Sequence, residues 1–359
     1  MTPELPFSRD YVAGASPYEG IPTFGGFEHV PWQEIRALHA VDVGVLGIPY
    51  DNSVANRPGC RFGPRALRAN AFTAGYHHLP LGIDITEWLK IVDGGDAHCP
   101  HGLTDISHSN AFLAAQHIAA NTEFSVFIGG DHSITWPTAA AVASIYGWGE
   151  LGLIHFDAHA DAATEMDGNL ASHATPMRHL LDSGALKRGH FEQIGLRGYW
   201  PPPDVFAFVQ DHGGRWALME EVRARGIDAV LDEVIARMVA NCRAVYLSVD
   251  IDVLDPSAAP GTGTPEPGGM QPIELLHAVR RIALETPLVA LDVMEVSPPY
   301  DHADVTVNNA HRVIFETLAA LATKKRAGAG GQPHLPGTSP PTIRESPRRP
   351  TSPTSPAPE

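Results

Sequence analysis

Three segments of the chain carry residue types that bind metal ions, and in each of them these residues follow an apolar run. In one segment, Asp157, His159 and Asp161 come directly after Leu153-Ile-His-Phe156, at alternate positions. Alternate side chains of an extended segment point to the same side, so these three side chains can converge on one point. The spacing therefore predicts a cation site just past the end of a strand.

A second segment, Ile128-Gly-Gly-Asp131-His132-Ser133, predicts a buried strand that breaks at two glycines. Two interpretations are open at this point. Asp131 or Ser133 caps a following helix, or the imidazole of His132 binds a metal ion.

In the third segment, Asp250 and Asp252 follow the apolar run Tyr246-Leu-Ser-Val249. Two carboxylates on one side of a chain repel each other unless a cation or a proton lies between them. Two nearby residues receive other interpretations. His155 lies inside a predicted strand and is expected to be structural, and Asp255 precedes a proline and is expected to form a turn.

The three segments together supply four carboxylates and two imidazoles: His132, Asp157, His159, Asp161, Asp250 and Asp252. Six ligands exceed the needs of one zinc ion, and this donor set suits two divalent ions such as Mn²⁺. Two ions roughly 3.5–4 Å apart form a familiar hydrolytic unit that activates water near neutral pH. The charges of four carboxylates and two divalent ions cancel. A hydroxide bound to these ions therefore gives the centre a net charge of about −1. Such a centre favours a cationic substrate over a phosphate ester.

Short apolar strands that alternate with helices are expected to position these ligands. Strands are predicted at 41–48, 89–92, 124–128, 151–156, 193–196, 244–249 and 288–293, and helices at 66–76, 109–120 and 220–239. This alternation predicts a three-layer α/β/α domain with a mainly parallel sheet. Sites in such folds lie beyond the carboxyl ends of the strands, which is where all three ligand segments begin.

The chain is expected to have three parts. Residues 1–35 are rich in Gly, Pro and aromatic side chains, which predicts an N-terminal arm. Residues 36–325 are expected to form the catalytic domain. Residues 326–359 contain nine prolines and almost no aliphatic side chains, which predicts a disordered Pro/Ser-rich tail.

The composition excludes several classes of partner. The formal net charge is −16, and no basic stripe interrupts the body of the chain, so a nucleic-acid partner is not expected. The three cysteines lie far apart, outside any zinc or CxxC spacing. The first residues lack the pattern of a secretion signal, and no apolar run reaches membrane-spanning length, so we expect no membrane association and a cytoplasmic protein.

These three segments resemble the three signature motifs of the ureohydrolase family, which includes arginase and agmatinase, and the likeness to its agmatinase-like branch extends from Val41 to Ala322. The resemblance implies a binuclear centre, usually of Mn²⁺ and in some relatives of Ni²⁺, that hydrolyses a guanidino group to urea and an amine. By the same resemblance, one ion takes His132, Asp157, Asp161 and Asp250, and the other takes Asp157, His159, Asp250 and Asp252.

The resemblance also implies roles for residues outside the metal set. Glu295, in Leu291-Asp-Val-Met-Glu295, matches the glutamate that binds the guanidinium group, and His173 matches the histidine that relays protons to the leaving amine. We count Asp161 with these two as catalytic. Thr264 is similar to a threonine that lines the substrate pocket, and Asn169 is a candidate substrate contact from the loop at 162–172.

The substrate is expected to be small or to lack a carboxylate. Ala160 and Ala174 depart from the common agmatinase pattern, the 162–172 loop contains no Lys or Arg, and the 195–203 segment is bulky and aromatic. Agmatine, guanidine, an alkylated guanidine or a biguanide such as metformin fits these features. The alternatives are a guanidinobutyrase- or guanidinopropionase-type enzyme, a formimidoylglutamase-type hydrolase, and a subunit of a hetero-oligomeric ureohydrolase. Because relatives form trimers and hexamers, the resemblance implies a homo-oligomer, while a hetero-oligomer with a paralogous subunit stays open.

Overall fold

A computed structural model describes residues 19–70 and 75–329, and these are built around one nine-stranded sheet in the order β1-β5-β2-β6-β11-β10-β7-β8-β9. Every neighbouring pair in this sheet is parallel. Its strands are β1 (Glu28–His29), β2 (Val43–Gly47), β5 (Ile91–Asp96), β6 (Phe124–Ile128), β7 (Leu151–Phe156), β8 (Leu186–Leu196), β9 (Arg215–Leu218), β10 (Ala244–Asp250) and β11 (Leu288–Met294). The short strands β3 (His77–His78) and β4 (Ile83–Asp84) form a separate antiparallel pair.

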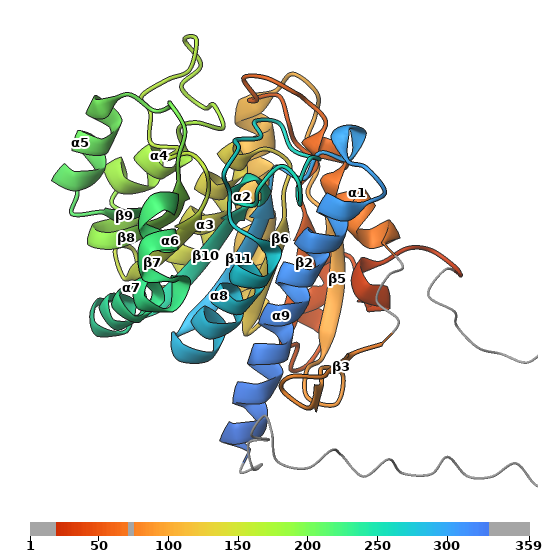
Figure 1. Ribbon diagram of the computed structural model, residues 1–359. Coiled ribbons are helices and arrows are strands. Elements are labelled where there is room, and N and C mark those ends of the chain that lie inside the picture. Colours follow the sequence, from red (N-terminus) through yellow and green to blue (C-terminus); the bar gives the residue numbers. More distant parts are fainter. Residues whose placement is uncertain (1–18, 71–74, 330–359) are drawn as a thin grey trace, which may run out of the picture.

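Helices cover both faces of this sheet, so the domain has three layers (Figure 1). One layer contains α2 (Thr104–Asn121), α3 (Thr135–Tyr146), α4 (Pro176–Asp182) and α5 (Pro203–Asp211). The other contains α1 (Gly63–Ala69), α6 (Met219–Arg225), α7 (Ile227–Asn241), α8 (Pro272–Glu285) and α9 (Val305–Gly328). Because both faces are covered, the central strands β6, β7 and β10 are buried along their whole length, which explains why they are continuous apolar runs in the sequence.

The predicted architecture is confirmed, and the strands at 124–128 and 151–156 have the bounds that the sequence predicts. Two helix predictions are wrong. The single helix expected at 220–239 is divided into α6 and α7 at Gly226. Gly226 has a φ of 82°, a left-handed backbone conformation that favours glycine over other residue types. The helix expected at 66–76 ends at Ala69, and Tyr76 lies next to β3.

The predicted domain boundaries stay predictions, because the ends of the chain lie outside the described residues. Within the described part of the arm, Phe24 is buried and its backbone N–H donates to Asp93, and β1 pairs with β5 at the edge of the sheet. At the other end α9 continues to Gly328, three residues beyond the predicted end of the domain. The Pro-rich tail falls almost entirely on residues that the structure does not describe.

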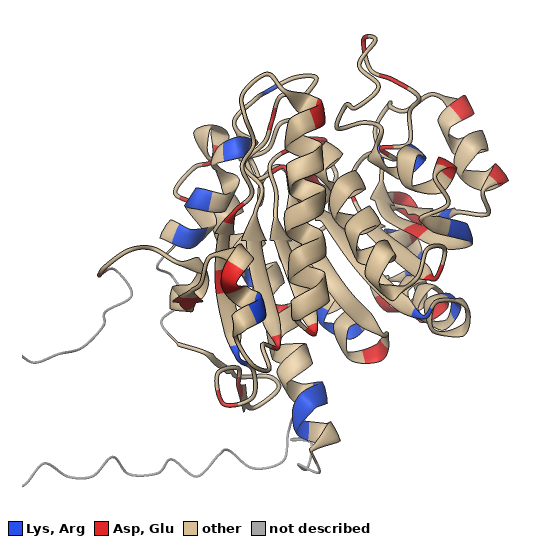
Figure 2. Cartoon of the chain, turned by 180° about the vertical axis from the view of Figure 1, so that it is seen from behind, with Lys and Arg blue, Asp and Glu red and all other residues tan. Residues whose placement is uncertain are grey.

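Positions of Lys and Arg and positions of Asp and Glu alternate along the ribbon in the view of Figure 2. That nucleic acid is not a partner stays a prediction from the net charge of −16. Among residues 19–70 and 75–329, no helix is long and apolar enough to cross a membrane.

Acid is expected to destabilise the fold partly through His108 of α2, which is packed between Tyr50 and Trp136. Burial lowers the pKa of His108 from 6.5 to about 4. Between these values the unfolded chain binds a proton that the folded chain does not. The free energy of unfolding therefore falls as the pH drops from about 6.5 to 4, by up to about 3 kcal/mol for this one group.

The measurement is urea unfolding of the metal-free protein at pH 7 and pH 5. A His108→Gln variant is expected to lose less stability between these pH values than the wild type. The matched control is His39→Gln, which replaces an exposed histidine and is expected to behave as the wild type. An unchanged pH dependence in His108→Gln would contradict the prediction.

Candidate metal centre

The candidate site lies at the carboxyl ends of four neighbouring strands, β6, β11, β10 and β7. The register of the sheet brings their ends level. Val249 of β10 lies opposite Phe156 of β7, so Asp250 and Asp157 follow side by side. Asp250 also lies opposite Met294 of β11, so that Glu295 is the next residue along that strand. Residues from four distant parts of the sequence therefore meet at one edge, at the carboxyl ends of the strands.

The Gly-Gly turn after β6 places His132 at this edge. Gly130 lies very close to the backbone of Tyr50. A Cβ atom on residue 130 would be 1.6 Å from the carbonyl oxygen of Tyr50, so this position accepts only glycine. Asp131 then accepts hydrogen bonds from the backbone N–H groups of Ser133 and Ser53, both at 3.0 Å. Asp131 therefore caps the 3-10 helix η4 (His132–Ile134), which confirms the first interpretation of this turn. The imidazole of His132 lies at the same edge, and its role as a metal ligand stays a prediction.

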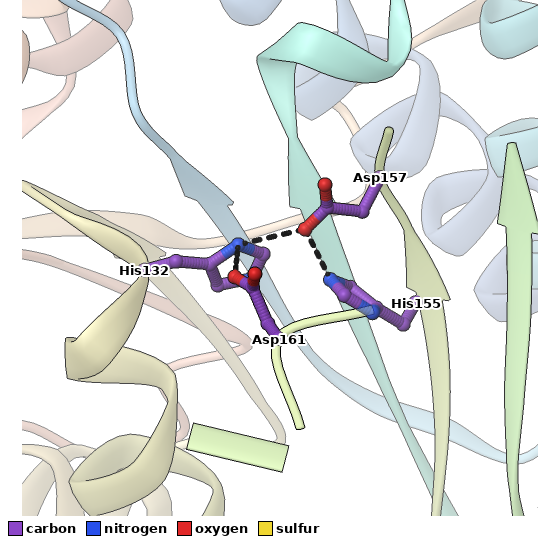
Figure 3. A group of neighbouring side chains, drawn as sticks. All are labelled: His132, His155, Asp157 and Asp161. Atoms are coloured by element: carbon purple, nitrogen blue, oxygen red, sulfur yellow. Dashed lines mark ion pairs between the residues drawn. The ribbon is translucent and has the colours of Figure 1, made fainter. Parts of the chain in front are cut away.

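One group of donors surrounds Nδ1 of His132. This atom lies 3.2 Å from Oδ2 of Asp157, 3.2 Å from Oδ2 of Asp161 and 3.0 Å from Oδ2 of Asp250. Figure 3 shows the imidazole with Asp157 and Asp161 directed toward it. Asp161 has a φ of 47°, a left-handed conformation that is uncommon outside glycine and that turns its carboxylate back into the site.

A second group surrounds Nδ1 of His159, which lies 3.4 Å from Oδ1 of Asp157 and 3.1 Å from Oδ2 of Asp252. Asp157 therefore presents one carboxylate oxygen to each group. The hydroxyl of Thr264 donates to Oδ2 of Asp252 at 3.2 Å and fixes this second carboxylate. All six sequence-predicted ligands thus lie in one place. Asp157 is common to the two groups, whereas the contact of Asp250 with an imidazole is in the His132 group.

The chemistry of this cluster fits two divalent cations. Oδ2 of Asp157 is buried and has no hydrogen-bond partner. Burial, together with the neighbouring Asp252 and Asp157, raises the pKa of Asp250 well above its ordinary value. Burial alone would lower the pKa of His132, but its contacts with three carboxylates raise it well above the usual range. Without cations the cluster therefore retains protons, and two divalent ions would balance its four carboxylates.

Behind His132, a buried polar chain orients the ring. Nε2 of His132 lies 2.9 Å from the hydroxyl of Ser248. Next to Ser248, Asp292 accepts hydrogen bonds from Thr135 at 2.8 Å and Tyr246 at 2.7 Å. Nδ1 is thereby left to face the carboxylates. The sequence analysis missed this chain, although an acidic residue inside the apolar run Leu288-Val-Ala-Leu-Asp292 was a visible signal.

Glu295 lies beside the metal cluster and is joined to His173. Its Oε1 accepts hydrogen bonds from the backbone N–H of His132 at 2.9 Å and from Nδ1 of His173 at 3.1 Å, while Oε2 has no hydrogen-bond partner. Nε2 of His173 accepts from the backbone N–H of Ala55 at 3.1 Å, so in the neutral ring the proton is on Nδ1. Burial acts to lower the pKa of His173, but the hydrogen bond to Glu295 and the nearby carboxylates raise it to about 9.

A pocket of about 170 Å³ opens over the cluster of proposed ligands, and none of the described residues that line it is Lys or Arg. Its lining residues are Ala55, His159, Asp161, Met166, His173, Ala174, Trp200, Asp250 and Thr264. The ring of Trp200 packs edge-on against His159 with a centroid distance of 6.2 Å. The structure thus brings Thr264, Ala174 and Trp200 to the pocket, as expected from the sequence. Met166 and Ala55 were missed, because their types carry no chemical signal.

Some sequence-predicted residues lie away from the pocket. Asn169 is exposed and its side chain accepts from the backbone N–H of Ala171 at 3.0 Å, so its proposed contact with substrate has no support in this geometry. Ala160 is fully buried and does not line the pocket. Asp255 accepts from Ser257, Gly268 and Gly269, which confirms its predicted turn, and the hydrogen bond to Ser257 lowers its pKa to about 2.

Comparisons with known proteins agree with this geometry. A sequence model described as the Arginase family matches residues 41–320. The chain is 38% identical to a proclavaminate amidinohydrolase from Streptomyces clavuligerus over 314 residues, which cover 86% of this chain and 96% of that protein. It is 38% identical to a guanidinopropionase from Pseudomonas aeruginosa, with 85% and 93% covered. The solved structure of proclavaminate amidinohydrolase from Streptomyces clavuligerus superimposes with a TM-score of 0.79 and 35% identity, and covers 86% of this chain and 99% of that chain.

Proposed function

This chain belongs to the arginase family, and from that premise we propose that it hydrolyses a small guanidino compound to urea, or a urea derivative, and an amine. As a member of this family it is a hydrolase that acts on C–N bonds of linear amidines. The observation that carries the proposal is the pair of donor groups around His132 and His159, which share Asp157. We assign the ligands of the two ions as His132, Asp157, Asp161 and Asp250 for one, and Asp157, His159, Asp250 and Asp252 for the other. Mn²⁺ is the preferred ion and Ni²⁺ the alternative.

Two divalent ions bound here would supply an activated water near neutral pH and stabilise negative charge as it develops. The remaining steps belong to side chains of this chain. Oε2 of Glu295 is buried without a partner and is free to accept charge-assisted hydrogen bonds from a guanidinium group. Its Oε1 is already fixed by His132 and His173, so the carboxylate is held in place before substrate binds.

His173 is the proposed source of the proton that the leaving amine requires. An amine leaves poorly unless its nitrogen is protonated. Nδ1 of His173 holds its proton next to Glu295 and thus next to the proposed guanidinium position. We place Asp161 with these two residues, because it lines the same pocket.

The pocket supports a substrate that is small or lacks a carboxylate. Beyond the metal ligands and His173, its walls are largely apolar, with Ala55, Met166, Ala174 and Trp200. Arg57 follows the pocket residue Ala55 by two positions, but its guanidinium lies over the ring of Tyr300 at 5.4 Å. Among the described residues that line the pocket, a carboxylate would thus meet no Lys or Arg side chain. Agmatine, guanidine, an alkylated guanidine and a biguanide such as metformin are the candidates.

The competing candidate is a substrate with a carboxylate, and it is favoured by the names of two relatives, which refer to guanidinopropionate and proclavaminate. Substrate pairs of equal length separate the two proposals. We expect propylguanidine to be hydrolysed with a kcat/KM at least about 10-fold higher than 3-guanidinopropionate, since burying an unpaired carboxylate is costly. The reverse order would support the guanidinobutyrase or guanidinopropionase type.

The measurement is a colorimetric urea assay of the enzyme loaded with Mn²⁺ or with Ni²⁺. Agmatine, guanidine and metformin complete the panel, and formiminoglutamate with detection of formamide tests the formimidoylglutamase type. Absence of turnover with the whole panel, by protein that contains two ions per subunit, would contradict the proposed function or indicate a subunit that needs a paralogous partner.

Location and assembly are part of this proposal. Cys60, Cys99 and Cys242 are all free thiols in the described structure, which supports a reducing compartment such as the cytoplasm. We propose a homo-oligomer, a trimer or a hexamer as in relatives, with a hetero-oligomer as the alternative. The mass of the metal-loaded protein in solution distinguishes them.

A further inference from the structure

His155 is a fully buried histidine on β7 that the proposed mechanism does not use. Its Nε2 lies 2.7 Å from Oδ2 of Asp157, the oxygen that faces His132 (Figure 3). Its Nδ1 lies 2.9 Å from the side-chain nitrogen of Gln193, which is opposite His155 on the neighbouring strand β8. His155 has the right position to be a third imidazole ligand, or to act on the centre through Asp157.

The contacts of Gln193 decide which of the two nitrogens of His155 carries the proton. The same amide nitrogen of Gln193 donates to the carbonyl oxygen of Ala160 at 2.8 Å. A backbone carbonyl only accepts, so the NH₂ end of the amide must face Ala160 and His155. Nδ1 of His155 is therefore an acceptor, and the proton of the neutral ring is on Nε2, which faces Asp157.

A nitrogen that carries a proton has no lone pair for a metal ion. His155 in this tautomer is a donor to Asp157 and not a ligand. The two atoms lie 2.7 Å apart, and neither of them has a hydrogen-bond partner elsewhere among the described residues, so each is available to the other. Two neighbouring rings fix the imidazole of His155. It stacks on Phe191 with a centroid distance of 6.2 Å, and it meets the His132 ring edge-on with a centroid distance of 4.8 Å.

We propose that His155, held in one tautomer by Gln193, is a positioning residue for Asp157, the carboxylate shared by the two metal groups. The inference rests on the proposed metal centre and adds to it the relay from Gln193 to His155 to Asp157. A donor behind a ligating carboxylate fixes its orientation, and loss of such a contact weakens metal binding by roughly 10- to 100-fold.

The test measures the dissociation constant and stoichiometry of Mn²⁺ by isothermal titration calorimetry at one fixed pH. His155→Phe keeps a ring of similar shape and removes the donor, and Gln193→Met removes the amide and frees the tautomer. Each is expected to weaken Mn²⁺ binding roughly 10- to 100-fold while two ions still bind. The double variant is expected to lose no more than His155→Phe alone, because both changes break the same relay.

The matched control is His190→Phe, which replaces a buried histidine of β8 that contacts the carbonyl oxygen of Leu151 and not the metal groups. Its Mn²⁺ affinity is expected to equal that of the wild type. His155→Gln, whose amide still donates, is expected to recover part of the affinity and covers the case in which His155→Phe fails to fold. Thermal unfolding of the metal-free proteins checks that the fold is retained.

The outcomes separate this inference from the proposed function. If the wild type binds no Mn²⁺ or Ni²⁺, the metal centre itself is wrong. If the wild type binds two ions and both His155 variants bind them equally well, only the relay is wrong. If a His155 variant binds one ion where the wild type binds two, His155 is a direct ligand and the tautomer argument is overturned.

Discussion

An Asp157→Asn variant is expected to lose both ions of the centre and all measurable urea production. Asp157 directs one carboxylate oxygen at the donors around His132 and the other at the donors around His159. Asparagine offers one oxygen and no charge, so three carboxylates would remain to balance four positive charges. We expect kcat/KM to fall by at least about 1,000-fold, or about 4 kcal/mol in the activation barrier.

Metal content by atomic emission and urea release are measured on the same purified samples. The control is Asp182→Asn, which removes one negative charge from an exposed position on α4. It is expected to bind two ions and to retain wild-type activity. A metal-free Asp157→Asn protein with full activity would refute the binuclear mechanism.

The proposed metal ligands illustrate how much of the site can be predicted from the sequence. The alternate spacing of Asp157, His159 and Asp161 places them on one strand end, and two other apolar runs end in the same way. A parallel sheet brings such ends to one edge, so the sequence could predict that the six proposed ligands lie together at the three strand ends. Which oxygen faces which imidazole could not be predicted, because it depends on the register of β10 against β7 and on the left-handed φ of Asp161.

The residues that the sequence did not reveal act through packing or through hydrogen bonds behind the ligands. Gln193 was read only as the start of a strand, since the first part of β8 is polar and has no apolar pattern. Its importance comes from lying opposite His155, which depends on strand pairing. Met166 became a pocket residue only through the loop that carries it over the centre. In contrast, Asn169 looked suitable by type, but it lies in the exposed part of that loop.

A Glu295→Gln variant is expected to separate binding of the guanidinium group from binding of the metal ions. Glutamine keeps the shape of the side chain, and its oxygen still accepts from the backbone N–H of His132 and from His173. The second oxygen, which has no partner in the protein, becomes an NH₂ group that faces the donors of the substrate. Two charged hydrogen bonds are lost, each contributing about 1.5–3 kcal/mol, so kcat/KM should fall by about 100- to 10,000-fold.

Mn²⁺ stoichiometry and affinity are expected to stay at wild-type values in this variant. The carboxylate oxygens beside His132 Nδ1 and His159 Nδ1 belong to aspartates and not to Glu295. The control is Glu316→Gln, a buried glutamate of α9 that pairs with His78 and Arg280, away from the centre. It is expected to change stability and not kcat/KM. Unchanged kcat/KM in Glu295→Gln would assign guanidinium binding to another residue. A loss of metal would instead make Glu295 part of the metal centre, because glutamine keeps the contact with the backbone of His132.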